Sequence, residues 1–270
     1  MLGSKIAVRL AGVLGAVLEV SVFEALFFLS AWFFEAVVGG GYGWHSKAVM
    51  IVLGVFGLFL HGLRGRYNPL PRDLGFSLKW SGYVAILFLS CSTTAVAFST
   101  FLGFFRSVDA GALLLDIIWF LVFVGFAEEL FFRGYVQERL NEVFTGKFGN
   151  FLGVRFEWHK GTLIAGVFFF GLAHLLGAVN PFTGRFALDY VLLGVTASAC
   201  FIGVVLGVIK EKTGGILLPA VIHGLLDFTT FGVGKVTGLL LSSIASAAAL
   251  FLFFAFLFER IFLPIDTNRT

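Results

Sequence analysis

Long apolar runs separated by short polar breaks occupy almost the whole chain. Most runs approach or exceed the roughly 20 residues that an α-helix needs to cross a bilayer, and they are far longer than the strands of a membrane barrel. Lipid also forces every backbone polar group into an internal hydrogen bond, which a helix achieves by itself. The pattern therefore predicts an all-α, polytopic membrane helix bundle. About eight transmembrane helices are expected, at residues 7–38, 48–61, 80–105, 111–140, 161–177, 188–209, 215–232 and 236–263.

The composition supports this prediction and excludes a soluble domain. Hydrophobic residues make up 59% of the chain and charged residues only 13%, whereas an average soluble domain is about one quarter charged. No linker or charge block divides residues 1–270, so a single integral membrane domain is expected. The chain starts like a signal peptide, with Lys5 and Arg9, but its first apolar run is too long and contains Glu19 and Glu24. These features favour a retained first helix.

The distribution of positive charge predicts the orientation, because cytoplasmic loops of membrane proteins are enriched in lysine and arginine. If the N-terminus is cytoplasmic and every segment crosses, all lysines and arginines fall on the cytoplasmic side except Lys47, Arg106, Arg185 and Lys235. Both termini are therefore expected in the cytoplasm. The basic residues lie between apolar runs and show no interleaving with aromatic residues, so no nucleic-acid partner is expected.

Ionisable residues inside apolar segments are costly and often mark functional sites. The fourth segment contains Glu128 and Glu129, followed by Arg133. Glu129 lies four residues before Arg133, the orientation that favours a helical ion pair, whereas Glu128 points about 100° away and has no local partner. An unpaired carboxylate in apolar surroundings has a raised pKa, which suits a general base near neutral pH. The alternative interpretation is that both glutamates only mark the membrane edge.

Two further apolar segments carry a histidine. His174 follows an aromatic stretch in the fifth segment, where a histidine can equally be a hydrogen-bonded packing residue. In the seventh segment His223 and Asp227 share one helix face at a spacing of four, so the aspartate can orient the imidazole. Pro219 lies one turn earlier and cannot donate a backbone hydrogen bond, so the helix is expected to begin or kink there.

The depths of these groups in the membrane follow from a rise of 1.5 Å per residue. Glu128 comes out roughly 6 to 18 Å from the cytoplasmic face, His174 at about 20 Å and His223 at about 12 Å. These ranges overlap or nearly do so. The three groups are therefore expected to meet in one layer, in the cytosolic half of the bundle.

The order and spacing of these residues resemble a known family. Residues 128–133 have the form Glu-Glu-x-x-x-Arg, residues 170–174 the form Phe-x-x-x-His, and residues 223–227 the form His-x-x-x-Asn/Asp. Together they resemble the CAAX protease and bacteriocin-processing family of intramembrane endopeptidases, of the CAAX prenyl protease 2 type. The resemblance covers a catalytic core at about residues 111–232. The stretch Arg72-Asp73-Leu74-Gly75 is similar to a short upstream motif of that family.

The resemblance implies a glutamate-dependent endopeptidase that cleaves a membrane-associated peptide or a lipidated, for example prenylated, protein. Glu128 would activate a water, His174 would help to position or polarise it, and His223 would stabilise the oxyanion of the tetrahedral intermediate. In the family the residue four positions later shares this last role, but here it is Asp227, and an ionised aspartate cannot donate a hydrogen bond. It must be protonated or act by orienting His223. The acid–arginine pair of the first motif would hold the catalytic helix in place.

Three other functions are compatible with these residues. Two histidines and two glutamates can ligate zinc, but the HExxH spacing is absent and no third histidine falls in the cluster, so no cofactor is expected. His45, His61 and His159 lie near loops and are expected at the surface. A non-catalytic membrane protein of the same fold, such as a bacteriocin-immunity or scaffold protein, is the second alternative. A transporter also uses intramembrane carboxylates and histidines, but no inverted repeat is detectable.

Four further acidic residues lie in apolar segments, namely Glu19, Glu24, Glu35 and Asp116. They can pair across helices, gate the entry of a substrate or line the outer half of the bundle. Their spacing does not choose among these roles.

Overall fold

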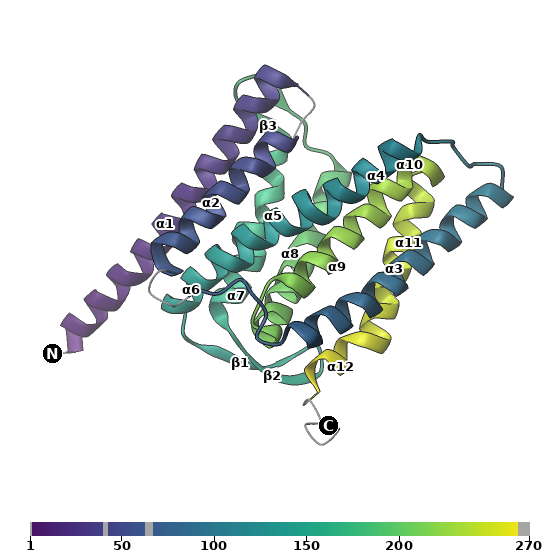
Figure 1. Ribbon diagram of the computed structural model, residues 1–270. Helices are drawn as coiled ribbons and strands as arrows, with labels where there is room; N and C mark the ends of the chain where they lie inside the picture. Colours follow the sequence, from purple (N-terminus) through teal and green to yellow (C-terminus); the bar gives the residue numbers. More distant parts are fainter. Residues whose placement is uncertain (1, 40–42, 63–66, 264–270) are drawn as a thin grey trace.

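The computed structural model describes the backbone of residues 2–39, 43–62 and 67–263, and their side chains except at 2–9 and 62. Within these residues, eight helical stretches are long and apolar enough to cross a membrane, which confirms the predicted number of spans. They pack as a bundle (Figure 1). Their bounds are Leu10–Val38, Trp44–His61, Leu74–Phe101, Ala110–Val143, Lys160–Ala178, Tyr190–Thr213, Leu217–Thr237 and Leu239–Phe262.

Four of the spans are single α-helices, and the other four change helix type along their length. The single helices are α1 (Leu2–Val38), α2 (Trp44–Gly62), α3 (Leu74–Phe101) and α8 (Tyr190–Thr213). The fourth span comprises α4 (Ala110–Ile118), η1 (Trp119–Phe126), α5 (Ala127–Glu129), η2 (Leu130–Val136) and α6 (Gln137–Val143). The fifth comprises α7 (Lys160–Ile164), η3 (Ala165–Gly171) and η4 (Leu172–Ala178). The seventh comprises α9 (Leu217–Asp227), η5 (Phe228–Gly232) and α10 (Val233–Thr237). The eighth comprises α11 (Leu239–Leu252), η6 (Phe253–Phe258) and α12 (Glu259–Phe262). Here η4 is a 3₁₀-helix, and the other η elements are π-helices.

Two short antiparallel hairpins lie between the spans, so the fold is mostly helical rather than all-α. The strands are β1 (Lys147–Phe151), β2 (Val154–His159), β3 (Val179–Asn180) and β4 (Arg185–Phe186). The strand β1 pairs with β2, and β3 pairs with β4. The first hairpin turns at Leu152 and Gly153, which both have positive φ, of 47° and 85°. These segments are too short and too polar to register as apolar runs, and for this reason the hydropathy pattern did not predict them.

The third span begins at Leu74, six residues before the predicted start. The preceding Asp73 caps the helix, because its carboxylate accepts a hydrogen bond of 2.8 Å from the backbone N–H of Phe76. A side-chain acceptor at this position satisfies one of the free N–H groups of the first turn. The upstream motif therefore starts a helix.

The same motif also contacts the turn between α8 and α9. The backbone N–H of Arg72 donates to the carbonyl of Thr213 over 3.0 Å. Gly214 follows with a φ of +74°, and a Cβ at this position would lie 2.3 Å from Cγ of Arg72. The turn therefore requires glycine. Since α9 begins at Leu217, Pro219 lies in its first turn, which confirms the predicted helix start.

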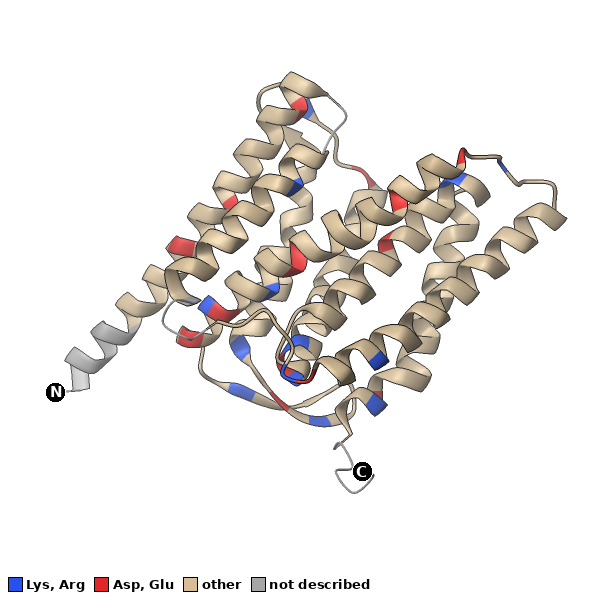
Figure 2. Cartoon of the chain, viewed as in Figure 1, with Lys and Arg blue, Asp and Glu red and all other residues tan. Residues whose placement is uncertain are grey.

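Lysine and arginine gather at one end of the bundle, the terminal face, where α1 begins, α12 ends and the β1–β2 hairpin lies (Figures 1 and 2). The cations predicted outside belong to elements at the opposite end. They are Lys47 in the first turn of α2, Arg106 between α3 and α4, Arg185 in β4 and Lys235 in α10. The cations predicted inside and those predicted outside therefore largely separate between the two ends of the bundle. The predicted cytoplasmic residues Arg64, Arg66 and Arg269, and the side chains of Lys5 and Arg9, lie outside the described residues.

Two glycines of the sixth span allow a close approach of the fifth span. A Cβ at Gly203 would lie 2.5 Å from the carbonyl oxygen of Gly166, and one at Gly207 would lie 2.7 Å from Cγ2 of Thr162. The two glycines therefore pack helices within this chain. This contact brings the spans of the candidate site together.

Candidate active site

Glu128 and Glu129 lie near the middle of the fourth span, in α5 between the π-helical elements η1 and η2. Such π-turns inside α-helices are frequent at functional sites. Both carboxylates are buried, with exposed fractions of 9% for Glu128 and 0% for Glu129. Because neighbouring positions of a helix point about 100° apart, the two side chains meet different partners.

Glu129 binds two partners in the interior. Its Oε1 lies 3.1 Å from Nη1 of Arg133, which confirms the predicted pair at a spacing of four. The same oxygen lies 2.9 Å from Nδ1 of His223. Arg133 also donates to the carbonyl of Gly203 over 3.2 Å, and its guanidinium lies 4.0 Å from the ring centroid of Phe170. The acid–arginine pair therefore joins the fourth, fifth, sixth and seventh spans.

His223 faces carboxylates with both ring nitrogens. While Nδ1 contacts Glu129, Nε2 lies 3.7 Å from Oε2 of Glu128 and 3.5 Å from Oδ2 of Asp227. The structure thus brings together the predicted residues of the fourth and seventh spans. An imidazole can donate from either nitrogen, and an ionised carboxylate can only accept. Asp227 thus lies one helical turn after His223 and beside its Nε2.

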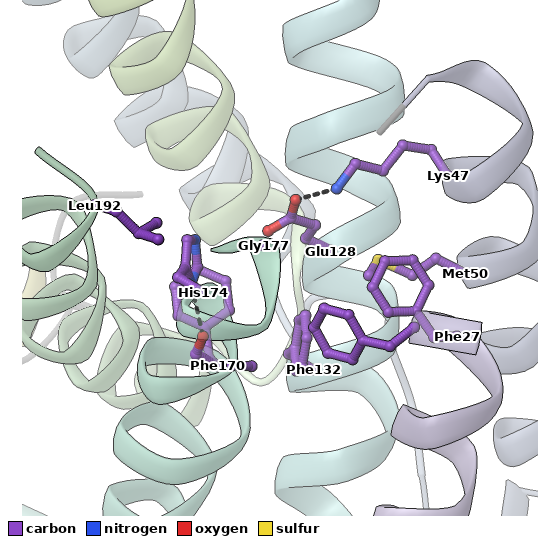
Figure 3. Close-up of a pocket in the computed structure, with 11 residues that line it drawn as sticks. Phe27, Lys47, Met50, Glu128, Phe132, Phe170, His174, Gly177 and Leu192 are labelled. Atoms are coloured by element: carbon purple, nitrogen blue, oxygen red, sulfur yellow. Dashed lines mark hydrogen bonds and ion pairs between the residues drawn. The ribbon is translucent and has the colours of Figure 1, made fainter. Parts of the chain in front are cut away.

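A cavity of about 340 Å³ lies beside Glu128 (Figure 3). Three polar side chains line it, those of Glu128, His174 and Lys47. Most other lining residues are aromatic or aliphatic, among them Phe27, Phe28, Met50, Phe132, Phe170 and Leu192. An apolar cavity with a few convergent polar groups is typical of a ligand site.

His174 lies on the 3₁₀-helix η4, and its ring is oriented by the backbone. Its Nδ1 donates a hydrogen bond of 2.8 Å to the carbonyl of Phe170. With Nδ1 carrying the proton, a neutral imidazole has its lone pair on Nε2. The Phe170 ring packs in T-shaped geometry against the rings of both His174 and His223, with centroids 5.2 Å and 5.5 Å apart. His174 thus lines the cavity together with Glu128, and the backbone fixes the orientation of its ring.

Lys47 is the residue of this site that sequence reasoning missed. It is only 7% exposed, and its Nζ is hydrogen-bonded to Oε1 of Glu128 (Figure 3). Glu128 has no local partner on its own helix, as expected, but Lys47 reaches it from 81 positions away, so the carboxylate is not unpaired. The sequence placed Lys47 outside the membrane because it lies at the edge of an apolar run. Its position in the first turn of a span was the available signal, since a long side chain there can reach into the bundle.

Close helix packing holds the two halves of the site in contact. A Cβ at Gly125 would lie 2.5 Å from the carbonyl oxygen of Ala220, and a Cβ at Gly224 would lie 2.7 Å from that of Phe120. The fourth and seventh spans therefore touch backbone to backbone close to Glu128 and His223.

A larger residue at this crossing should separate the two spans. We expect Gly125→Val to destabilise the protein by about 1–3 kcal/mol, the usual cost of an overpacked interior. Melting in detergent measures this, with Gly82→Val as the matched control, because a Cβ at Gly82 meets nothing within 4 Å. Equal melting temperatures for the two variants would contradict the packing argument.

An ion pair at the end opposite the terminal face holds the segment after His174. Arg185 of β4 pairs with Glu35 at the end of α1, and its Nη2 also donates to the carbonyl of Gly177 over 3.1 Å. The fully buried Asn180 donates to Glu35 over 2.8 Å. Glu35 therefore anchors the β3–β4 hairpin against the first span, next to the cavity wall at Gly177.

The other acidic residues of apolar segments lie away from the cavity lining. Glu19 accepts hydrogen bonds from Tyr135 and Arg139, over 2.9 Å and 2.8 Å. Asp116 pairs with Lys235 over 2.6 Å. Glu24 is half-buried, and its Oε1 has no hydrogen-bond partner among the described residues. Cross-helix pairing is thus the observed arrangement for Glu19 and Asp116.

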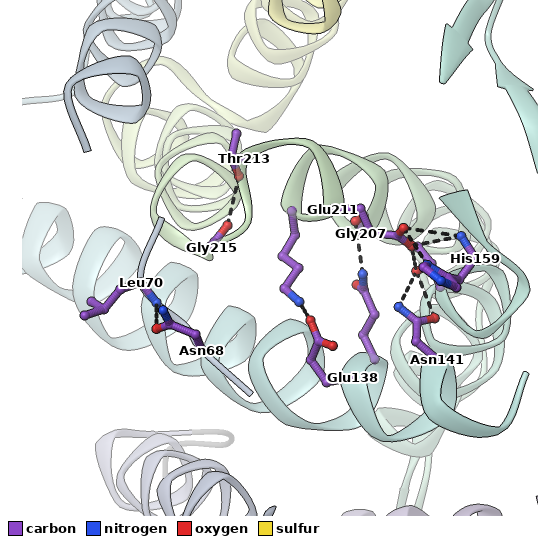
Figure 4. A network of polar contacts seen from close by, with 12 residues as sticks. Asn68, Leu70, Glu138, Asn141, His159, Gly207, Glu211, Thr213 and Gly215 are labelled. Carbon is purple, nitrogen blue, oxygen red and sulfur yellow. Dashed lines mark hydrogen bonds and ion pairs between the residues drawn. The ribbon is translucent and has the colours of Figure 1, made fainter. Parts of the chain in front are cut away.

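The predictions for the three remaining histidines had mixed outcomes. His45 is exposed and stacks on Phe34, as expected for a surface residue. His61 and His159 are half-buried and contact carboxylates, at 2.5 Å from Glu19 and 2.8 Å from Glu211, so that prediction is wrong for these two. His159 belongs to a polar network near the terminal face (Figure 4). That network also contains the pairs Glu138–Lys210 and Asn141–Thr162.

Comparison with known proteins finds a family match for the part of the chain that contains most of these site residues. Residues 110–229 match the family model described as Rce1-like, type II CAAX prenyl endopeptidase. The matched range contains Glu128, His174, His223 and Asp227. Lys47 and the capping motif at Arg72-Asp73 lie before it. No curated protein and no solved structure matches the chain.

Proposed function

The chain belongs to the Rce1-like family of type II CAAX prenyl endopeptidases, which are intramembrane proteases, and on this basis we propose that Glu128 is the general base of its peptide hydrolysis. The observation that carries the proposal is the position of Glu128. Its carboxylate lines the aromatic cavity together with His174, and His223 contacts it from the seventh span.

The proposed reaction begins with a water held between Glu128 and Nε2 of His174. Glu128 takes a proton from this water as the oxygen attacks the carbonyl carbon of the scissile peptide bond. The carbonyl oxygen becomes an oxyanion, which the N–H of His223 stabilises. The C–N bond then breaks, and Glu128 returns the proton to the leaving amine. The products are a new carboxyl group and a new amino terminus, and the carboxylate of Glu128 is regenerated.

The residues around this centre act through their neighbours in the proposal. The carboxylate of Asp227 lies 3.5 Å from Nε2 of His223 and favours a proton on that nitrogen, whose N–H is then free to donate to the oxyanion. Glu129 holds the other ring nitrogen of His223, and Arg133 neutralises Glu129. The substrate we propose is a membrane-associated peptide or a lipidated, for example prenylated, protein, because the cavity wall is largely apolar and adjoins lipid-crossing helices.

A peptidase assay in liposomes tests the proposal against its two alternatives. Purified protein is expected to cleave a quenched fluorescent peptide, either amphipathic or prenylated, and to retain this activity with a chelator. In the described residues, no group of three or more histidine, cysteine, aspartate or glutamate side chains is arranged to hold a metal ion. Chelator inhibition that added zinc reverses would support a zinc protease instead. The absence of cleavage for every peptide would support a non-catalytic protein of the same fold.

The orientation in the membrane is a second part of the proposal. The positive charge at the terminal face favours a cytoplasmic location for that face and for both termini. Glu128 then lies roughly 22 Å along the helix from Val143, near mid-depth rather than well inside the predicted cytosolic half. The cavity extends from there toward Lys47, Gly177 and Leu192, which lie near helix ends at the other face. We therefore propose a mid-depth site whose mouth faces away from the termini.

Thiol labelling in sealed vesicles of known orientation tests this topology. In a background without Cys91 and Cys200, Leu192→Cys at the cavity should react with an impermeant maleimide from the outside. Lys160→Cys, near the terminal face, should react only after permeabilisation. The reverse pattern would place the termini outside and turn the cavity toward the cytosol, as the first depth estimate predicted.

A further inference from the structure

The roles proposed for the other site residues do not explain why Lys47 is buried in the cavity. Its ammonium is withdrawn from water and paired with the carboxylate that serves as general base. A buried ion pair is weak evidence for stability, because the desolvation of two charges often cancels their attraction. A long lysine stem is also flexible, so its charge can follow a charge that forms nearby.

The hydrolysis requires more donors than His223 alone supplies. An oxyanion is best stabilised by two or more positioned hydrogen-bond donors. The described nitrogen donors that approach the carboxylate of Glu128 are Lys47 at Oε1 and His223, whose Nε2 is 3.7 Å from Oε2. The Nδ1 of His174 already donates to the carbonyl of Phe170. Asp227 is an acceptor and faces His223.

We propose that Lys47 is a catalytic residue that binds the oxyanion together with His223. The inference rests on the proposed function. In the resting site the ammonium of Lys47 is hydrogen-bonded to the carboxylate of Glu128. When water and the scissile carbonyl enter, the water takes its place on the carboxylate, and the ammonium moves to the carbonyl oxygen. Lys47 stays protonated throughout, so the proton balance of the reaction is unchanged. Its positive charge compensates the negative charge that develops on the oxygen.

Steady-state kinetics of Lys47→Gln test this role. We expect a kcat about 10²–10³ lower than that of the native protein, the usual cost of one oxyanion donor, with little change in KM. Lys235→Gln is the matched control, because it breaks another lysine–carboxylate pair, with Asp116, outside the cavity. The control should keep native kcat. An unchanged kcat for folded Lys47→Gln would overturn the proposal.

Substitutions of Asp227 test whether Lys47 acts as a hydrogen-bond donor or only as a positive charge. Adding Asp227→Asn to Lys47→Gln supplies an amide donor beside His223 and should raise kcat at least tenfold. Adding Asp227→Leu removes the same negative charge in a similar volume without a donor, and kcat should stay low. Equal recovery by both would show that Lys47 only balances charge, which contradicts the inference.

Two further variants separate a failure of this inference from misfolding of Lys47→Gln and from a failure of the proposed function. If Lys47→Gln does not fold, Lys47→Arg decides, because a guanidinium still pairs with Glu128 but presents its N–H groups differently. Its kcat should fall at an unchanged melting temperature, and native kcat would overturn the proposal. If Glu128→Gln retains activity, the proposed function fails. If Glu128→Gln is inactive while folded Lys47→Gln is fully active, only the role of Lys47 fails.

Discussion

Replacement of Glu128 with glutamine is expected to lower the rate of peptide hydrolysis by about 10²–10⁴, the typical contribution of a general base. Glutamine has the same shape, and its amide oxygen can still accept a hydrogen bond from Lys47. It cannot take a proton from water, so the attack on the carbonyl loses its base. The effect should appear in kcat, because binding in the aromatic cavity is unaltered. Initial rates over a range of peptide concentrations measure it.

The control for this variant is another buried acid of the same span. Asp116 has the same exposed fraction as Glu128, 9%, and also pairs with a lysine, but it lies outside the cavity lining. Asp116→Asn should therefore retain native kcat. If Glu128→Gln is folded and fully active, Glu128 is not the general base. If Asp116→Asn is folded and equally inactive, the loss does not report on the cavity.

Replacement of Arg133 with leucine is expected to cost about 3–5 kcal/mol of stability, the usual effect of removing one partner from a buried ion pair. The carboxylate of Glu129 is fully buried and would lose its neutralising partner. The variant also loses the hydrogen bond to Gly203 and the contact with Phe170. Unfolding of the reconstituted protein by denaturant measures the change in free energy.

A second substitution tests the electrostatic origin of that loss. Adding Glu129→Gln to Arg133→Leu removes the uncompensated charge and should recover a large part of the stability. Arg139→Leu is the comparison for a half-buried pair, since the side chain of Arg139 is 18% exposed and water screens its contact with Glu19. It should cost clearly less than Arg133→Leu. Equal losses for both arginines would show that burial does not decide the effect.

The number of spans and the polar groups of the site could be predicted from local patterns. The length of an apolar run alone decides whether a helix crosses a bilayer, so all eight spans were predicted, although the third begins earlier because Asp73 caps it. The pair of Glu129 with Arg133 depends only on helical periodicity. The meeting of Glu128 with His223 followed from rough depths, because parallel or antiparallel helices of a bundle align residues of similar depth.

Which distant partner a buried charge takes was decided only by the tertiary structure. Lys47 and Glu128 are 81 positions apart, and Arg185 and Glu35 are 150 apart, on segments whose neighbours the pattern does not specify. A hydropathy pattern states that a segment lies in the membrane, but it does not state which face of one helix packs on which other helix. The close crossings at Gly125 and Gly203 show such choices, since they join the fourth span to the seventh and the sixth to the fifth. The sequence by itself therefore determined the membrane bundle and its candidate base. The packing decided that this base shares an aromatic cavity with a histidine and a lysine.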